Sequence, residues 1–171
     1  MLPSPAEVRA QWSSAHPGLD TASMEVVELL KRAIALVSTA VESVYEGAPL
    51  TVPEVDLLIP LRYATAPVIA RRIAEHHGLS RAAVSKTLAK LDRRGFITRT
   101  PSAADKRVAL ITVTPEGKKA VDALFPHQLK VESVLLSALG DDQPKVLEAL
   151  SLLVRSMESR LATASRESAR G

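Results

Sequence analysis

Residues 68–114 read VIARRIAEHHGLSRAAVSKTLAKLDRRGFITRTPSAADKRVALITVT. Apolar residues at helical spacing predict a first helix over Val68–His77, and Gly78 is a residue that commonly follows a helix end. Ser80 is a favourable N-cap for a second helix that continues to Arg94. Two helices joined by a short, glycine-containing turn predict a helix-turn-helix unit.

The second half of the stretch has the residue pattern of β-strands. Ile97–Thr100 and Val108–Thr114 alternate β-branched and polar residues, and the residues between them, 101–107, contain proline, serine and charged residues. This pattern predicts a β-hairpin with a charged tip. We therefore expect a mainly α protein with a small β-hairpin wing beside a helix-turn-helix.

The second helix has two different faces. Its apolar stripe is Val84, Leu88 and Leu91, and the opposite side alternates small residues with cations. Small residues allow a helix to approach closely inside a major groove about 12 Å wide, while lysine and arginine reach bases and phosphates. The following residues form this side: Ala82, Lys86, Ala89, Lys90 and Arg93. The alternative is an ordinary solvated surface helix.

The hairpin tip suggests a second contact. Asp105 lies two residues before Arg107, so we expect its carboxylate to brace the guanidinium and direct it outward. An arginine held in this way can enter a narrow minor groove, where negative potential is concentrated. An exposed ion pair without function remains the alternative.

The charge of the chain is unevenly distributed. The 171 residues carry a formal net charge of +3, but residues 62–107 hold 11 lysines and arginines against three acids, a local balance of +8 that leaves −5 elsewhere. A concentrated cationic block attracts polyanions through counterion release. A solvated basic face without a partner remains the alternative.

Apolar residues at spacings of three and four recur near both ends of the chain. One series lies on a long helix predicted over Met24–Tyr45, and the other on a helix that begins near Asp141. The two series are Val27, Leu30, Ile34, Val37, Val41 and Val44, and Leu147, Leu150, Val154, Met157 and Leu161. Periodicity leaves open whether these seams pack within one chain or between two. Ser23 is the expected cap of the first of these helices.

The order of these features resembles the MarR family of winged-helix transcriptional regulators. The resemblance is carried by Leu50-Thr51, Ile73-Ala74-Glu75, Leu79-Ser80-Arg81, the LDRRGF segment at 91–96, Arg99, Asp105-Lys106-Arg107 and Thr114-Pro115-Glu116-Gly117. It implies a homodimer that binds an inverted-repeat operator in double-stranded DNA, with repression as the usual mode. It also favours packing of the apolar seams between two chains.

The resemblance implies one intertwined domain in three parts and a set of DNA contacts. The parts are an N-terminal extension with a long dimerisation helix (1–48), a winged helix-turn-helix lobe (49–114) and C-terminal dimerisation helices (115–171). The implied DNA-binding residues are Arg81, Ala82, Ser85, Lys86, Lys90 and Arg93 on the second helix, and Asp105, Lys106 and Arg107 in the wing.

The N-terminal extension is similar to that of the urate-responsive subgroup of the family. That similarity implies a ligand site of Trp12, Asp56 and Arg99, with Thr87 at the position where the subgroup has an arginine. The missing arginine removes a charge-assisted hydrogen bond, which disfavours urate itself. We expect a small anionic or aromatic effector. The alternatives are a packing anchor for Trp12 and a structural salt bridge between Asp56 and Arg99.

Several other classes of protein are disfavoured. The chain has no cysteine, which excludes thiolate chemistry, and its four histidines are not clustered for a metal. It shows no enzyme motif, cofactor motif, secretion signal or apolar run of membrane length. We therefore expect a cytoplasmic, non-enzymatic regulator that needs no cofactor. The rival hypothesis is a winged-helix module for protein contact or non-specific DNA binding, without an effector.

Overall fold

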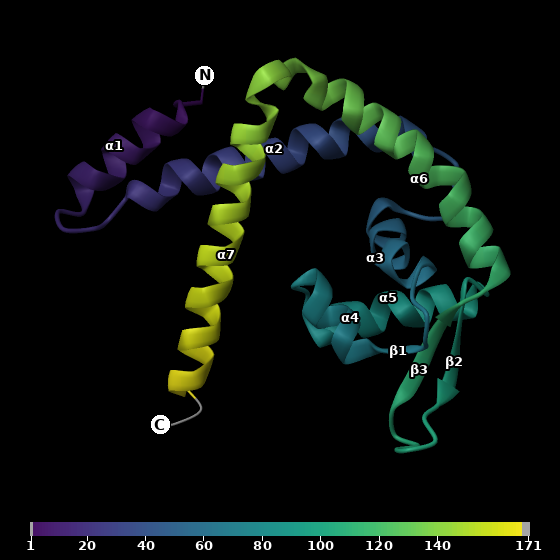
Figure 1. Ribbon diagram of the computed structural model, residues 1–171. Helices are drawn as coiled ribbons and strands as arrows, with labels where there is room; N and C mark the ends of the chain where they lie inside the picture. The colour runs from purple at the N-terminus through teal and green to yellow at the C-terminus, as the bar shows by residue number, and fades with distance from the viewer. Residues whose placement is uncertain (1, 169–171) are drawn as a thin grey trace. The chain divides into compact units, whose positions relative to one another are not determined.

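The computed structural model describes residues 2–168 (Figure 1). It divides into two compact units, Met1–Glu132 and Ser133–Gly171. The elements are α1 (Pro5–Ala15), α2 (Ala22–Val41), the 3-10 helix η1 (Glu42–Val44), α3 (Val52–Arg62), β1 (Val68–Ile69), α4 (Ala70–His77), α5 (Arg81–Arg93), β2 (Ile97–Pro101), β3 (Ala109–Val113), α6 (Pro115–Leu136), the 3-10 helix η2 (Ser137–Asp142) and α7 (Gln143–Ser168). The prediction of a mainly helical fold with a small β wing is confirmed.

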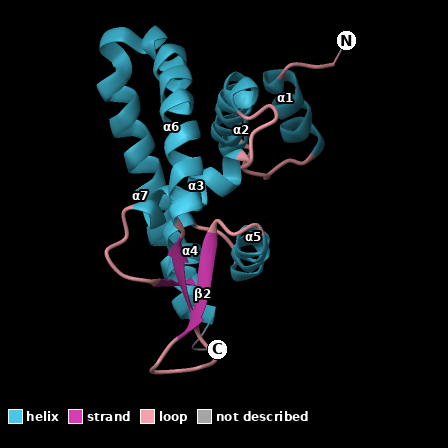
Figure 2. Cartoon of the chain, turned by 90° about the vertical axis from the view of Figure 1, so that its right-hand side faces the viewer, coloured by secondary structure: helices cyan, strands magenta, loops and turns pink. Residues whose placement is uncertain are grey.

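Three strands form one antiparallel sheet in the order β1-β3-β2. Figure 2 draws the strands in magenta. The sequence pattern predicts only two of them, because apolar residues at helical spacing place Val68–Ile69 in the following helix. These residues instead pair with Ile111 and Leu110 of β3. Two β-branched or apolar residues suit such an edge strand, and the pairing satisfies backbone groups that a helix start would leave free.

The N-terminus of α2 also differs from the prediction. Thr21 is the residue before the helix, and Ser23 lies inside its first turn rather than capping it. Asp20 accepts a hydrogen bond from the backbone N–H of Ala22 at 2.9 Å. A carboxylate near a helix N-terminus is electrostatically favourable. Asp20, and not Ser23, therefore stabilises the start of α2.

One apolar core holds the first unit together. It is built from α3, α4, α5, the sheet and the start of α6, and Leu58, Leu88 and Leu91 within it have no exposed surface. By contrast, α1 has no buried residue and α2 has only Val41. Burial in a single chain is therefore concentrated in the lobe that carries the helix-turn-helix.

Glu54 is a buried charge at the centre of this lobe. Its carboxylate accepts hydrogen bonds from the backbone N–H of Thr51, at 3.0 Å, and from Nη1 of Arg94, at 2.7 Å. Burial raises the pKa of Glu54, but the hydrogen bonds from Thr51 and Arg94 outweigh it and the pKa lies below its ordinary value. The ion pair therefore joins the start of α3 to the end of α5.

Helix α6 begins in direct contact with the sheet. Thr114 donates its hydroxyl proton to the carbonyl of Gly95 at 2.7 Å and accepts a hydrogen bond from the N–H of Gly117 at 3.0 Å. A Cβ atom on Gly117 would lie 2.0 Å from the carbonyl oxygen of Phe96 and 2.8 Å from Cγ1 of Val113. Only glycine fits at this position without backbone movement.

None of the helices within residues 2–168 is both long and apolar enough to cross a membrane.

We expect Gly117→Ala to lower the free energy of unfolding by about 2 kcal/mol, because the new methyl group overlaps a backbone carbonyl. An unobstructed helical glycine would show the opposite sign, a gain of about 1 kcal/mol. Urea unfolding followed by circular dichroism measures the change. Lys119→Ala, at an exposed position of the same helix, is the control. A Gly117→Ala protein as stable as the wild type would contradict the close packing.

Candidate nucleic-acid interface and ligand site

The turn between α4 and α5 has the geometry that its sequence predicted. Gly78 adopts the left-handed conformation, with φ of 62°, and its N–H donates to carbonyls of the last turn of α4. Ser80 caps α5 by accepting a hydrogen bond from the N–H of Ala83 at 3.1 Å. Both features hold α5 at a defined angle to α4.

Helix α5 presents the predicted two faces. Val84, Leu88 and Leu91 are buried in the core. All six residues expected to contact DNA from this helix are exposed, namely Arg81, Ala82, Ser85, Lys86, Lys90 and Arg93. The buried stripe fixes which side of the helix faces outward, and that side is cationic.

The basic residues of the lobe fall into two groups. Carboxylates neutralise one group, as Arg62 pairs with Asp122 at 3.0 Å and Arg94 with Glu54. The other group forms no ion pair among the described residues, and it consists of Arg81, Lys86, Lys90, Arg93, Arg99, Lys106 and Arg107. The cations left without a carboxylate are those of the outer face of α5 and of the wing.

The wing tip corrects one detail of the prediction. Asp105 Oδ1 accepts a hydrogen bond from the backbone N–H of Arg107 at 2.9 Å, and no ion pair forms with the guanidinium. An aspartate that binds the backbone two residues ahead stabilises a tight turn. Asp105 therefore shapes the loop, while the exposed side chains of Lys106 and Arg107 remain in solvent.

The four predicted ligand residues lie on four separate elements. Trp12 is on α1, where it is 49% exposed and stacks on His16 with ring centroids 4.9 Å apart. Thr87, on α5, donates its hydroxyl proton to the carbonyl of Ala83. Arg99, on β2, has a buried Nε without a hydrogen-bond partner among the described residues. The structure does not join any two of the four by a hydrogen bond, ion pair or ring contact within that range.

Asp56 has different neighbours from those predicted. In the described chain Asp56 forms no ion pair with Arg99. The side chains that shift its pKa are Gln128, Glu132 and His77. Burial raises the pKa of Asp56, and Glu132 raises it further. Sequence reasoning missed Gln128, whose position seven residues after Val121 on the core-facing side of α6 was the available signal.

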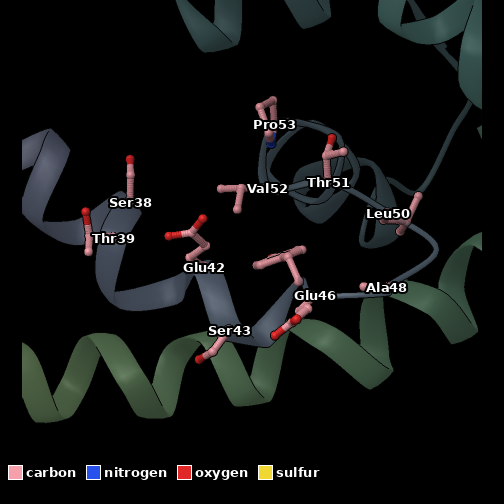
Figure 3. Close-up of a pocket in the computed structure, with 11 residues that line it drawn as sticks. Ser38, Thr39, Glu42, Ser43, Glu46, Ala48, Leu50, Thr51, Val52 and Pro53 are labelled. Carbon is pink, nitrogen blue, oxygen red and sulfur yellow. The ribbon is translucent and has the colours of Figure 1, made fainter.

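Two cavities lie close to this region. An open groove of ≈ 980 Å³ is formed by the end of α2, by η1 and by the start of α3, and Figure 3 shows Glu42 and Glu46 across from Thr51, Val52 and Pro53. Among the described residues that line it there is no lysine or arginine, so it suits an anion poorly. A smaller pocket of ≈ 230 Å³ between α3 and α4 has an apolar floor and is lined by Arg72, His76 and His77.

Within the described residues, no group of three histidine, aspartate or glutamate side chains is placed to hold a metal ion.

Comparison with known proteins shows which family the helix-turn-helix lobe resembles. The family model of the MarR family matches residues 50–109. The HTH-type transcriptional regulator PecS of Dickeya dadantii (strain 3937) is 26% identical over 147 residues, which cover 85% of this chain and 89% of PecS.

Two solved structures share the fold. The MepR–DNA complex of S. aureus has a TM-score of 0.69 at 23% identity, covering 76% of this chain and 96% of MepR. Bordetella bronchiseptica BpsR, whose DNA binding is regulated by 6-hydroxynicotinic acid, has a TM-score of 0.66 at 23% identity and covers 84% of this chain and 98% of BpsR. The relatives are regulators rather than enzymes, as predicted. Residues 50–109 of this chain therefore resemble the MarR family, and the chain shares its fold with these two proteins.

Proposed function

We propose that this protein is a cytoplasmic repressor that binds an inverted-repeat operator as a homodimer and is released by a small effector. The observation that carries the DNA-binding part is the exposed cationic face of α5, whose orientation is fixed by Val84, Leu88 and Leu91 in the core. MepR, which has the same fold, was solved in complex with DNA. The proposed contacts place α5 in the major groove and Arg107 in the minor groove.

The rival hypothesis, a module for protein contact or non-specific DNA binding, fits the charge pattern less well. A surface for protein contact normally has an apolar or mixed centre, whereas the outer face of α5 combines small residues with cations. The two hypotheses differ in whether binding depends on DNA sequence.

We expect Arg107→Ala to weaken binding to the DNA that flanks the protein's own gene by about tenfold or more, because a base-groove contact is lost. Gel-shift titration in excess competitor DNA, repeated over a range of salt concentrations, measures the effect. Lys119→Ala removes a cation outside the proposed interface and serves as the control. Equal, weak binding of the wild type to every DNA sequence would favour the non-specific module.

The terminal helices support a homodimer. In a single chain, large apolar side chains of both predicted seams are in solvent: Val27, Ile34, Leu147, Leu150, Val154, Met157 and Leu161. Apolar stripes of this extent commonly mark an interface with another chain. Two copies with self-complementary seams would remove these stripes from water and would pair two α5 helices with the two halves of an operator.

We expect Ile34→Glu to convert the dimer into monomers, because a charge would be buried in the interface without a partner. Ile34 is 66% exposed in one chain, so the change leaves the core of the lobe intact. Analytical ultracentrifugation measures the mass, and circular dichroism checks the folding. Lys31→Glu on the same helix is the control. A dimeric Ile34→Glu protein would contradict the assignment of this seam.

The proposed effector is a small anionic or aromatic molecule that contacts residues of the set Trp12, Asp56, Thr87 and Arg99. Arg99 is the member whose side chain could most directly bind an anion, since its Nε is buried without a hydrogen-bond partner in the part of the chain that the structure describes. Its place at the base of the wing would let a bound anion alter the wing and α5 together. Binding that favours a conformer unsuited to DNA would lower the DNA affinity.

We expect salicylate, as an anionic aromatic probe, to bind the purified protein and Arg99→Ala to weaken that binding by about tenfold, through loss of a charge-assisted hydrogen bond. Isothermal titration calorimetry measures binding, and a gel shift measures release from DNA. Arg93→Ala, on the proposed DNA face, should leave salicylate binding unchanged. Absence of both binding and DNA release with salicylate and with other small anions would contradict an effector of this class.

A further inference from the structure

The smaller pocket, between α3 and α4, has the shape and floor of a site for a small apolar body. Its volume of ≈ 230 Å³ lies below the range of roughly 300–1,000 Å³ that is typical of sites for drug-sized ligands. Leu61 and Ile73 in its wall are buried in the core of the lobe. The aliphatic residues that line it are Pro60, Leu61, Ala64, Val68 and Ile73.

The polar groups of this pocket come from α4. Arg72, His76 and His77 line it, and no carboxylate is among the described residues of its lining. Nε2 of His77 is buried and has no hydrogen-bond partner in the part of the chain that the structure describes. Such atoms are uncommon in folded proteins, and a bound molecule is one way of satisfying them. Burial, followed by the neighbouring His76, lowers the pKa of His77, so its imidazole is neutral at physiological pH.

Arg72 supplies positive charge at the rim of the pocket and retains capacity to bind. Arg71 and Arg72 share the single carboxylate of Glu75, with Nε of Arg71 at 3.5 Å and Nη1 of Arg72 at 3.7 Å from its oxygens. The side chain of Arg72 is 69% exposed. An ion pair of this length and exposure contributes little stability, so the guanidinium can turn to another carboxylate at small cost. Two cations against one acid favour an anionic ligand here.

We propose that the pocket between α3 and α4 binds a monocarboxylate with a compact apolar body, which lies against the aliphatic floor while its carboxylate pairs with Arg72 at the rim. The imidazole of His77 is the further polar group in the wall beside it. The site shares no residue with the effector set Trp12, Asp56, Thr87 and Arg99. Binding here depends on the lobe alone and does not require the proposed function.

A ligand in this pocket would reach α5 through the turn that follows α4. The N–H of Leu79 donates to the carbonyl of Ala74 at 3.0 Å, and the N–H of Gly78 donates to carbonyls of the same helical turn. A shift of α4 is therefore carried to the start of α5. This consequence rests on the proposed function: a ligand that favours an orientation of α5 unsuited to the major groove lowers the DNA affinity.

Isothermal titration calorimetry of the full chain tests the binding, with 4-methylpentanoate and benzoate as probes. We expect at least one acid to bind, and its uncharged amide to bind about tenfold more weakly, because the amide lacks the charge that pairs with Arg72. The acid with the higher affinity shows whether the preferred body is branched or aromatic. Absence of binding by both acids at millimolar concentration, or equal binding of acid and amide, would overturn the proposal.

Two variants locate the bound acid. Arg72→Ala should weaken binding by about tenfold through loss of the ion pair, and Ala64→Leu should weaken it as strongly, because the larger side chain occupies the pocket. Both side chains are exposed, so the core is retained, and circular dichroism checks the fold. Arg71→Ala is the matched control, since Arg71 shares Glu75 but is not among the described lining residues. Unchanged binding in Arg72→Ala and Ala64→Leu, or equal weakening in Arg71→Ala, would overturn the inference.

Arg99→Ala separates this pocket from the effector set. It should leave the affinity for the bound acid unchanged. Weaker binding in Arg99→Ala with full binding in Arg72→Ala would place the acid at the effector set and overturn the inference. Gel shifts of the unliganded protein keep the two levels apart: weak, sequence-independent DNA binding contradicts the proposed function, whereas a failure of the acids to bind contradicts only the pocket.

Discussion

The ion pair between Glu54 and Arg94 is the constraint from which the arrangement of the DNA-binding lobe follows. Glu54 lies in the first turn of α3 and accepts a hydrogen bond from the N–H of Thr51, and Arg94 directly follows α5. One buried carboxylate therefore joins two residues that are 40 positions apart in sequence. Arg94 also lies over the ring of Phe96, 5.0 Å from its centroid, and the carbonyl of Phe96 meets Gly117 at the start of α6. Because an unpaired buried charge is costly, this chain of contacts leaves α5 few alternative positions.

Charge and burial are separated along the chain in a way that suits two tasks. The lobe between α3 and β3 contains the core and a surplus of cations, and the cations without a carboxylate partner among the described residues lie on α5 and in the wing. The segments on either side of the lobe lack this surplus, with 14 acids against 11 lysines and arginines over 1–48 and 115–171, and their helices leave apolar residues in solvent. A polyanion and a second apolar surface are the partners that these two compositions favour.

The sequence predicted the helices, the wing and the exposed face of α5 because these depend on local periodicity and on caps such as Ser80. The wrong predictions concern contacts between residues far apart in sequence, or hydrogen bonds between a side chain and the backbone. Strand β1 depends on pairing with β3, about 40 residues away, and two residues are too few for a strand pattern. The hydrogen bond of Asp105 to a backbone N–H cannot be distinguished from an ion pair by spacing alone. The groups that shift the pKa of Asp56 come from α4 and α6, and although helical spacing places Gln128 on the core side of α6, it does not indicate that Asp56 is near.

Trp12 gives the protein a built-in optical probe. It is the single tryptophan of the chain, so the intrinsic tryptophan fluorescence comes entirely from α1. Its indole is stacked on His16 and half exposed, so its emission depends on this ring contact and on the surrounding solvent. The intensity and wavelength of tryptophan emission therefore report on α1 alone. The helix-turn-helix contains no tryptophan and does not contribute to this signal.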